Sequence, residues 1–279
     1  MEQDYIKITF PKDPTIALVL EAMMDEAEVL SFETTNHDLS ILDLWENRDS
    51  LNTRLKELLP NASWREEKIE DQDWDKTWIE GFQPIRIARK LWVLPPWHEE
   101  KIPEGHIKII INPSNAFGTG THESTFLALK LLFKMIKPKD KIMDMGCGSG
   151  ILSIAAHKLG AGKIYACDLD EDIEHNITEN LQLNKIDDIK WEIADVLEME
   201  DYKCDLALIN IQKHVILPLL LRFNIAKHRP NRVILAGLLR DHKKVICKAL
   251  KEQGYTRLKI RRKNEWIAVS AVHRRKNEK

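Results

Sequence analysis

The sequence has little cysteine and no long apolar run, and both shortages exclude whole classes of protein. Its 4 cysteines are scattered and form no C-x-x-C pair: Cys147, Cys167, Cys204 and Cys247. This spacing favours neither a zinc site nor a disulfide framework, so we expect no bound metal and a reducing cytoplasm as the setting. No apolar stretch approaches the roughly 18 residues of a membrane helix, which excludes a membrane partner. The beginning, MEQDYIKITF, is acidic and then strand-like, unlike a signal or transit peptide.

A net charge of −2 conceals a strong asymmetry between the two ends of the chain. Residues 1–80 carry 8 Lys and Arg against 20 Asp and Glu, whereas residues 222–279 carry 18 against 4. An acidic first part suits a basic partner, and a basic last part suits phosphate groups. The plainer alternative is that both are solvated faces of ordinary elements.

Residues 1–69 contain neither glycine nor cysteine and no catalytic cluster, which favours a domain that recognises a partner. Asp13 and Pro14 form an N-cap and first-turn pair that opens a helix. The expected order is β-α-β-β-α-β, with strands at 5–10, 29–35, 39–45 and 62–70 and helices at 15–30 and 50–60. This order is the split pattern of a ferredoxin-like α+β domain. We expect a linker at residues 70–84 and a second domain at 85–279.

The second domain alternates strands with helices. Two strands, 90–97 and 106–113, come first, and a helix at 121–138 with Thr121 as its cap follows. Strands are then expected at 141–145, 163–168, 188–194, 204–210, 232–237, 255–263 and 265–272, with helices at 151–160, 171–184, 213–227 and 240–254. The alternation predicts a doubly wound, mostly parallel sheet of seven strands, and the closing strand pair predicts an antiparallel edge. This is a Rossmann-like methyltransferase architecture.

The stretch DMGCGSG, residues 144–150, follows a strand and opens a helix, as a nucleotide loop does. Its glycines, Gly146, Gly148 and Gly150, are spaced one residue tighter than the G-x-G-x-x-G of dinucleotide loops. Asp144 would repel a pyrophosphate, but it would attract an ammonium group. S-adenosylmethionine carries an ammonium and no phosphate, so the loop favours this cofactor over NAD.

Three polar residues end later strands and are further candidates. Asp168 is placed to accept hydrogen bonds from ribose hydroxyls; its alternative, capping the next helix, suits Asp170 better. Asp195 could lie near the adenine edge or be an ordinary turn residue. Asn210 ends the strand where the methyl acceptor lies in this fold, although a lone Asn after a strand is usually a turn residue.

A second glycine-containing stretch, NAFGTGTHEST at residues 115–125, precedes the cofactor loop. Gly118 and Gly120 would let the chain pass close over the methionine end of the cofactor, and Thr125 could offer its hydroxyl there. His122 is a candidate proton acceptor, but a histidine at a helix start is more often structural. We expect a loop that shapes the path of the substrate, formed by Phe117, Gly118, Thr119, Gly120 and Thr121.

Together, AFGTGTHEST, DMGCGSGILSIAAHKLGAGKIYACDLD and LALINI resemble the ribosomal protein L-eleven methyltransferase (PrmA) family. The resemblance extends to the linker and to the C-terminal strand EWIAVSAVHR, and it covers nearly the whole chain. It implies S-adenosylmethionine-dependent methylation of lysine side chains, and in some members of the N-terminal amine, of free ribosomal protein L-eleven. It also implies that the small first domain holds that protein. The family's cofactor-binding positions correspond to Thr125, Gly146, Asp168 and Asn210.

Two departures from the family pattern bear on the substrate. After Asn210 and Ile211 the chain continues with Gln212, Lys213 and His214, where small and apolar residues are common in the family. The stretch NPSNAFG also lacks the acidic residue that commonly precedes its proline.

The departures leave two alternatives open: a lysine methyltransferase acting on another protein, and a non-catalytic ribosome- or protein-binding module with a vestigial cofactor fold. The intact glycine loop and Asp168 count against the second. Methylation of DNA usually accompanies an Asn-Pro-Pro-aromatic segment, which Asn210 does not begin, so we expect no DNA partner. In the expected reaction the Asn210 side chain and the backbone of residues 117–121 orient the amine, because methyl transfer is chiefly a task of alignment.

Overall fold

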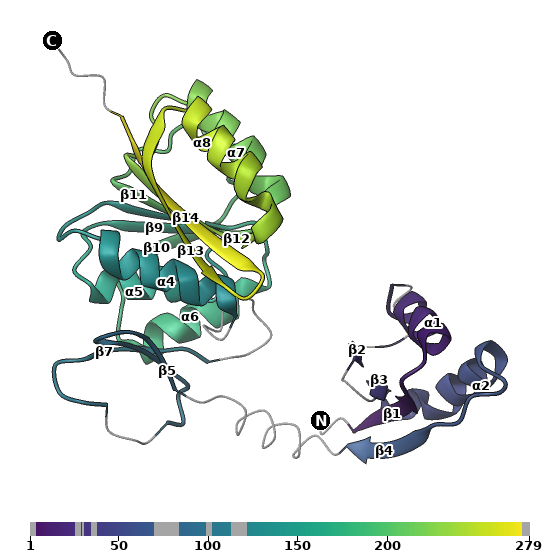
Figure 1. The fold of residues 1–279 in the computed structure, drawn as a ribbon. Helices are drawn as coiled ribbons and strands as arrows, with labels where there is room; N and C mark the ends of the chain where they lie inside the picture. The colour runs from purple at the N-terminus through teal and green to yellow at the C-terminus, as the bar shows by residue number, and fades with distance from the viewer. Residues whose placement is uncertain are drawn as a thin grey trace, which may run out of the picture. The chain divides into compact units, whose positions relative to one another are not determined.

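The structure is a computed structural model that describes residues 4–25, 29, 31–34, 38–69, 84–98, 102–112 and 122–274. The chain divides into two compact units, Met1–Phe82 and Gln83–Lys279, which are described separately below (Figure 1). The predicted linker, residues 70–84, lies outside the described residues except for its last one.

The first unit has the predicted order of strands and helices. Its elements are β1 (Tyr5–Pro11), α1 (Pro14–Asp25), β2 (Ser31–Thr34), β3 (Asp38–Leu44), α2 (Arg48–Leu58) and β4 (Arg65–Ile69). The sheet order is β2-β3-β1-β4, with β1 antiparallel to both β3 and β4. Asp13 caps α1 as predicted, because its Oδ1 accepts the backbone N–H groups of Thr15 at 2.8 Å and Ile16 at 3.1 Å.

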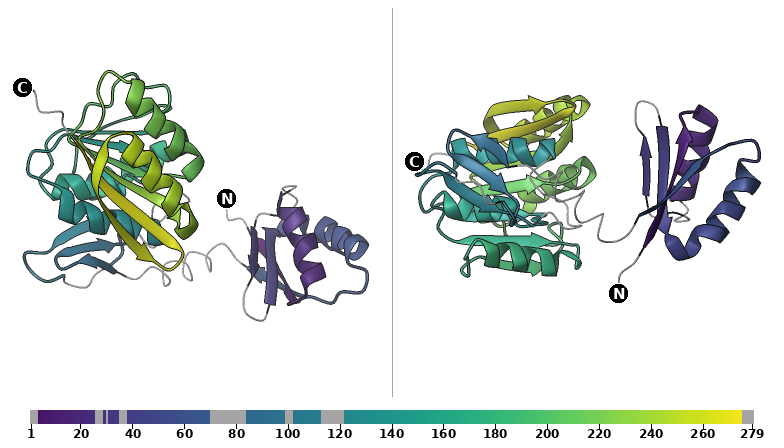
Figure 2. Two further views of the ribbon diagram at one scale, coloured as in Figure 1. Left: turned by 45° about the horizontal axis from the view of Figure 1, so that its top comes forward. Right: turned by 90° about the horizontal axis from the view of Figure 1, so that it is seen from below.

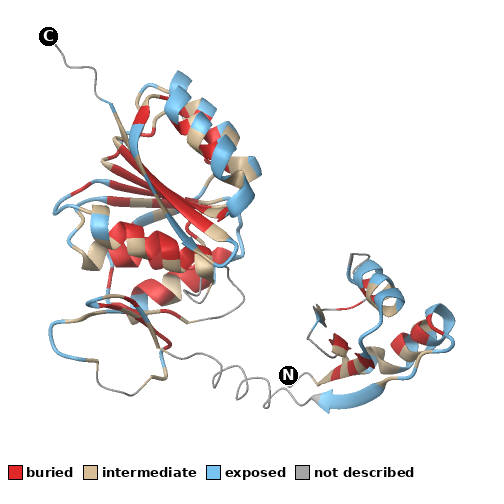
Figure 3. Cartoon of the chain, viewed as in Figure 1, coloured by how far each residue is buried: buried red, intermediate tan, exposed pale blue. Residues whose placement is uncertain are grey.

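One face of this small sheet forms the core of the unit. Ile6, Ile8 and Phe10 alternate along β1 with less buried residues and are fully buried, as the period of two of a half-covered strand requires. Figure 3 shows this alternation of buried and more exposed positions.

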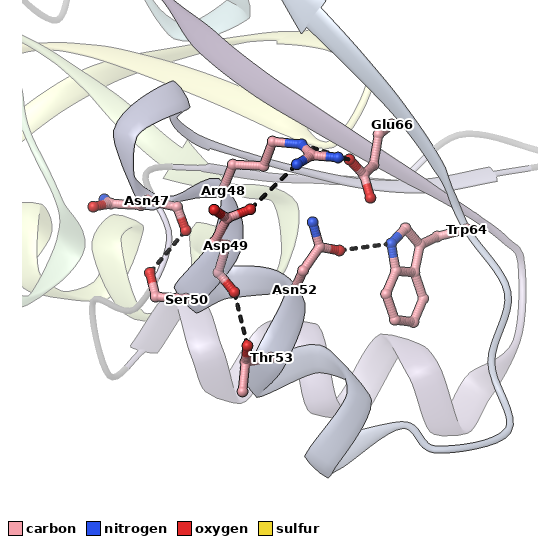
Figure 4. A network of polar contacts seen from close by, with 8 residues as sticks. All are labelled: Asn47, Arg48, Asp49, Ser50, Asn52, Thr53, Trp64 and Glu66. Carbon is pink, nitrogen blue, oxygen red and sulfur yellow. Dashed lines mark hydrogen bonds and ion pairs between the residues drawn. The ribbon is translucent and has the colours of Figure 1, made fainter.

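A polar network fastens α2 to β4 (Figure 4). The Arg48 guanidinium pairs with Glu66 at 2.8 Å and with Asp49 at 3.2 Å. The Trp64 ring N–H donates to Asn52 Oδ1 at 3.0 Å. Glu66 of β4 and Trp64, which directly precedes this strand, therefore both attach it to α2.

The second unit is built on a twisted sheet of seven strands, as predicted. The strands lie in the order β10 (Lys190–Ile193), β9 (Ile164–Asp168), β8 (Ile142–Met145), β11 (Leu206–Asn210), β12 (Arg232–Leu239), β14 (Trp266–His273) and β13 (Tyr255–Lys263). The first five are parallel, and β14 inserts antiparallel between β12 and β13. The antiparallel edge expected from the closing strand pair is therefore present.

Helices cover both faces of this sheet (Figures 1 and 2). One face carries α4 (Glu123–Met135), α5 (Ile151–Lys158) and α6 (Ile173–Leu183), and the other carries α7 (Lys213–Ile225) and α8 (Lys243–Glu252). Each set buries its own apolar cluster against the strands. This packing explains why the central strand β11 is buried along its whole length, with all five of its residues buried.

The two strands expected at 90–97 and 106–113 belong to a separate sheet. It consists of β5 (Ile85–Ala88), β6 (Leu91–Leu94) and β7 (Ile107–Ile110), and β5 had not been predicted. Side chains of α6 satisfy the backbone at the end of this sheet. Asn184 accepts from Ile110 N at 2.9 Å, and Asn180 accepts from Asn112 N at 2.8 Å.

The predicted cap of the first helix of this unit is wrong. We expected Thr121 to open the helix, but α4 begins at Glu123 and His122 occupies the N-cap, where its side chain accepts from the backbone N–H of Ser124. A histidine ring nitrogen can replace the hydroxyl in this role because it offers the same acceptor lone pair.

No helix among the described residues is both long enough and apolar enough to cross a membrane.

A buried ion pair joins the start of β12 to the end of α4 and to the loop that follows this helix. Arg232, at the start of β12, pairs with Asp140 at 2.5 Å and donates to the carbonyl oxygen of Met135, the last residue of α4, at 2.6 Å. Asp140 in turn accepts from Lys137 N at 2.7 Å. Both charged groups are nearly inaccessible, so each depends on the other for compensation.

We predict that Asp140→Ala lowers the free energy of unfolding by about 3–5 kcal/mol, because it leaves the Arg232 guanidinium buried without its counter-charge. Denaturant titration would measure the loss. The matched control is Glu252→Ala, which removes a carboxylate from the exposed pair with Lys248 and should cost less than about 1 kcal/mol. Equal losses in the two variants would contradict the prediction.

Candidate active site

The carboxyl ends of three neighbouring parallel strands meet at one cavity of about 440 Å³. The loop after β8, Asp168 at the end of β9 and Asn210 at the end of β11 reach it because β8 pairs in parallel with both other strands. Its walls include His122, Gly146, Cys147, Gly148, Ile151, Leu152, Asp168, Asp170, Ile173, Asn210, Ile211, Gln212, His214, Val215, Gly237 and Trp266. The volume and this position outside the strand ends suit a small organic ligand.

The glycine loop folds tightly at the bottom of this cavity. Gly146, Gly148 and Gly150 all have positive φ, at 75°, 49° and 75°. A Cβ at Gly146 would lie 2.1 Å from the Cγ2 atom of Ile211, so a larger residue cannot be accommodated there without displacing Ile211. Positive φ therefore favours glycine at all three positions, and at Gly146 the neighbouring Ile211 also excludes a side chain.

Asp168 holds the glycine loop in place. Its Oδ2 accepts the backbone N–H of Gly148 at 2.8 Å, and its Oδ1 accepts that of Asp170 at 3.2 Å. An ionised carboxylate has about four acceptor sites, so Asp168 retains capacity for the ligand hydroxyls predicted from the sequence. Asp170 binds Asp172 N rather than capping α6 directly, since the helix begins at Ile173.

Asp144 is buried beneath the loop and incompletely paired. Its Oδ2 accepts the Ser153 hydroxyl at 2.7 Å, while its Oδ1 has no hydrogen-bond partner in the described structure. Burial raises the pKa of Asp144 to about 7; the Ser153 hydrogen bond opposes this rise, and the Asp168 charge adds to it. A buried acceptor of this kind is ready for a cationic ligand, which would favour its ionised form.

Asn210 and Thr125 form a buried pair across 85 residues of sequence. The Asn210 Nδ2 donates to Thr125 Oγ1 at 3.1 Å, which fixes the orientation of the amide. Its Oδ1 is buried without a partner in the described structure, and Asn210 lines the cavity. Thr125 is fully buried and is not among the residues that line the cavity, so its hydroxyl acts on Asn210.

His122 forms a second wall with Trp266. The two rings meet edge to face with centroids 4.4 Å apart, and both line the cavity. The Nδ1 of His122 accepts the Ser124 N–H at 3.3 Å. The same Nδ1 lies 2.8 Å from the Ser124 hydroxyl oxygen. This ring nitrogen is therefore engaged in the helix cap, which favours the structural role of His122 over the proton-acceptor role.

The cysteine thiols at the site are chemically inert. Burial raises the pKa of Cys147 well above its usual range and that of Cys167 to about 12. A protonated thiol is a poor nucleophile, so Cys147 fills space in the loop.

The remaining predicted residues stand as follows. Asp195 is not among the residues that line the described cavity, and its carboxylate accepts the Leu197 N–H at 2.7 Å, as a turn residue does. Its contact with adenine stays a prediction. The expected substrate loop lies outside the described residues: Phe117, Gly118, Thr119, Gly120 and Thr121.

The described residues on either side of that segment lie close to the site. His122 lines the cavity directly. Asn112, on the other side, binds Asn180, whose side chain also donates to the carbonyl oxygen of Ser149 in the glycine loop at 3.0 Å. Asn112 and His122, the described residues that bracket it, are therefore both attached to the site.

Several wall residues were not identified from the sequence. Gly237 has a φ of 75°, and a Cβ there would lie 2.3 Å from the Ile211 carbonyl oxygen. A glycine at the end of an apolar strand was the available signal for it. Gln212 and His214 were noted only as departures from a pattern, and Trp266 carried no signal at all, because only the insertion of β14 brings it to the cavity.

The site fits S-adenosylmethionine by the chemistry of its unpaired atoms. The remaining lone pairs of Asp168 suit ribose hydroxyls, and the apolar wall suits an adenine ring. Asp144 is fully buried and does not line the cavity, so its carboxylate would favour an ammonium group by its charge from beneath the loop.

Comparison with known proteins points in the same direction. Residues 12–274 match the family described as ribosomal protein L11 methyltransferase (PrmA). The chain is 33% identical to a ribosomal protein L11 methyltransferase of Acetivibrio thermocellus over 202 residues, which cover 72% of this chain and 64% of that protein. It is also 33% identical to one of Lacticaseibacillus paracasei over 82% of this chain and 75% of that protein. The match therefore spans slightly less than two thirds of the Acetivibrio protein's own length.

Among solved structures, the ribosomal protein L11 methylase of Lactobacillus delbrueckii subsp. bulgaricus is similar, with a TM-score of 0.62 and 31% identity. The similarity covers 69% of this chain and all of that one.

The raised pKa of Asp144 predicts a particular pH dependence. The folded protein holds this proton up to about pH 7, whereas the unfolded chain releases it near the ordinary value of about 3.9. The contribution to stability is therefore complete below about pH 4 and is lost as the pH rises to about 7.

We predict that Asp144→Asn abolishes this loss of stability with rising pH. The unfolding free energy of the variant should therefore increase relative to that of the wild type between about pH 4 and 7. Chemical denaturation across this range would measure the difference, with Asp195→Asn as the control. The prediction is contradicted if Asp144→Asn and the wild type keep a constant difference.

Proposed function

The chain belongs to the ribosomal protein L11 methyltransferase (PrmA) family, and from this premise we propose that it transfers methyl groups from S-adenosylmethionine to amines of ribosomal protein L11. We propose lysine side chains as the acceptors, and the N-terminal amine as a further one. The observation that carries this proposal is the unpaired buried Oδ1 of Asn210 at the cavity wall.

When bound, S-adenosylmethionine would supply an electrophilic methyl group on a sulfonium. The residues that would hold it are Asp144, Asp168 and the loop from Gly146 to Gly150. The protein's own part is then to bind, orient and exclude water, because displacement at a methyl carbon is chiefly a matter of alignment.

Asn210 is the residue proposed to orient the amine. Thr125 accepts one of its amide hydrogens, which turns the Asn210 oxygen toward its role as an acceptor for an amine N–H. A lysine amine has a reference pKa of about 10.4 and must lose its proton before it can react. Desolvation in the cavity would lower that pKa, so the mechanism requires no strong side-chain base, and His122 does not need to act as one.

The first unit is proposed to recognise the substrate protein. Its sequence is strongly acidic, whereas ribosomal proteins bind RNA and are commonly basic, so charge favours their association. Residues 115–121 are proposed to shape the path of the incoming amine.

Gln212 and His214 support a second candidate, methylation of a different protein. Both line the cavity beside Asn210 and both are polar, so they could select another acceptor.

A direct test separates the two candidates. The enzyme is incubated with labelled S-adenosylmethionine and purified ribosomal protein L11, and mass spectrometry then locates the methyl groups. We expect methyl groups on lysines of ribosomal protein L11. If the enzyme labels only another protein when it is incubated with a cell lysate, that protein would replace ribosomal protein L11 as the proposed substrate.

We predict that Thr125→Val slows methyl transfer about tenfold, because loss of the hydroxyl leaves the buried Asn210 amide unpaired and unoriented, a cost of roughly 1–3 kcal/mol. The rate with saturating cofactor would report the change. The matched control is Thr256→Val, which makes the same replacement on β13, where the hydroxyl binds the Val272 carbonyl. An unchanged rate in Thr125→Val would refute the orienting role of Asn210.

We also predict that the double replacement of Gly118 and Gly120 by alanine slows transfer while leaving cofactor affinity within about twofold, because the segment is proposed to guide the amine rather than to hold the cofactor. Calorimetry and single-turnover rates would separate the two effects. A parallel loss of cofactor affinity would place the segment in the cofactor site instead.

A further inference from the structure

A second cavity of about 410 Å³ lies at the amino ends of the parallel strands of the seven-stranded sheet, opposite the first cavity. The cofactor cavity is at the carboxyl ends of the parallel strands, whereas this one is lined where those strands begin, by residues such as Ile142, Ile164 and Cys204. It is nearly as large as the first cavity, and the proposed methyl transfer makes no use of it.

Each of four adjacent strands brings one lysine to this cavity. In the sheet order β10, β9, β8, β11, they are Lys190, Lys163, Lys141 and Lys203. The first three begin or directly precede their strands, and Lys203 precedes β11 by three residues. Neighbouring strands lie about 4.8 Å apart, so the four lysines form a row that spans roughly 14 Å across the strand beginnings. The row is staggered along the strands, because Lys190 pairs with Tyr165 rather than with Lys163.

The ammonium groups of these four lysines have no hydrogen-bond or ion-pair partner within the described residues, and all four side chains are exposed. The row therefore presents four exposed ammonium groups without a bonded partner in the described residues, with the carboxylates of Asp188 and Asp205 as the nearby opposite charges.

Three of the four neighbouring carboxylates pair with groups outside the row, whereas Asp205 lies beside Lys141, whose backbone N–H and charge both lower the pKa of that carboxyl. Asp140 pairs with the buried Arg232, and Asp201 pairs with His228 at 3.0 Å. Asp205 accepts from the backbone of Lys141 at 3.0 Å and from Asn231 at 3.1 Å. Asp188 is the single acid among the cavity residues, and it pairs with His157 at 3.0 Å.

The concave shape of this cavity and the unpaired ammonium groups of its four lysines together indicate the chemistry of a ligand. A lysine ammonium binds phosphate oxygens as a point charge, and several converging lysines suit an anion with several phosphates. Aliphatic side chains in the same cavity would contact the non-phosphate part of such a molecule.

We propose that this cavity binds a polyphosphate anion through Lys141, Lys163, Lys190 and Lys203. The phosphates belong either to a free polyphosphate compound or to the backbone of RNA, and both present the same oxygens to the row. The site is independent of the proposed methyl transfer, because it lies at the other edge of the sheet.

The test uses the full-length protein and two probes, inorganic tripolyphosphate and a short single-stranded RNA. The cavity variant replaces the four lysines by alanine. The matched control replaces four other lysines by alanine: Lys243, Lys244, Lys251 and Lys259. These lysines are also exposed and do not line the cavity. Their replacement removes the same total charge.

Calorimetry at about 50 and 200 mM salt should show saturable binding of one tripolyphosphate per chain, weakened by salt. We expect the cavity variant to bind at least about tenfold more weakly and the control to remain within about twofold. Thermal melting and S-adenosylmethionine binding should be unchanged in both variants, which shows that they are folded.

The RNA arm identifies the source of the phosphates. RNA that binds and is displaced by tripolyphosphate would assign the row to an RNA backbone, and tripolyphosphate binding alone would assign it to a small anion. Absence of saturable binding for both probes, or an equal loss in the control variant, would overturn the proposal, the latter because it would show general charge attraction only.

Discussion

The parallel pairing of β8 with β9 on one side and β11 on the other is the constraint on which the site depends. The register sets Met145 opposite both Cys167 and Ile209, so the three strands end at the same level. Their next residues are then forced into one space, where Asp168 binds the backbone of the glycine loop and Asn210 reaches Thr125. Without this common level, neither contact could form.

The same constraint explains the polarity of the whole second unit. These neighbouring parallel strands also begin close together. The carboxyl ends of the strands therefore gather acids, an amide and glycines, while the amino ends gather lysines. The two edges differ in how their charges are compensated. At the carboxyl edge the unpaired groups are acceptors buried inside the protein, which suits a cationic ligand. At the amino edge they are exposed cations, which suit an anion.

Several sequence predictions followed from local chemistry and needed no tertiary information. Asp13 caps α1 because a side-chain oxygen close to the first turn has few other partners. The tight glycine spacing and Asp144 indicated the cofactor, since both lie within seven consecutive residues. The order of the elements and the antiparallel edge were also predictable, because apolar runs, turns and helix signals are all read within short windows. The helix cap was misplaced by one residue, because His122 serves as a cap only through its ring nitrogen.

The sequence by itself thus determined the alternation of strands and helices, the cofactor loop and the resemblance to a family. Only the tertiary structure decided which distant residues meet: Asn210 with Thr125, Trp266 with His122, and Gly237 with Ile211. It also joined the four lysines into one row. These pairings depend on strand order, and that of Trp266 with His122 depends on the insertion of β14 between β12 and β13. Strand order is fixed by packing over the whole sheet, and no local stretch of sequence encodes it.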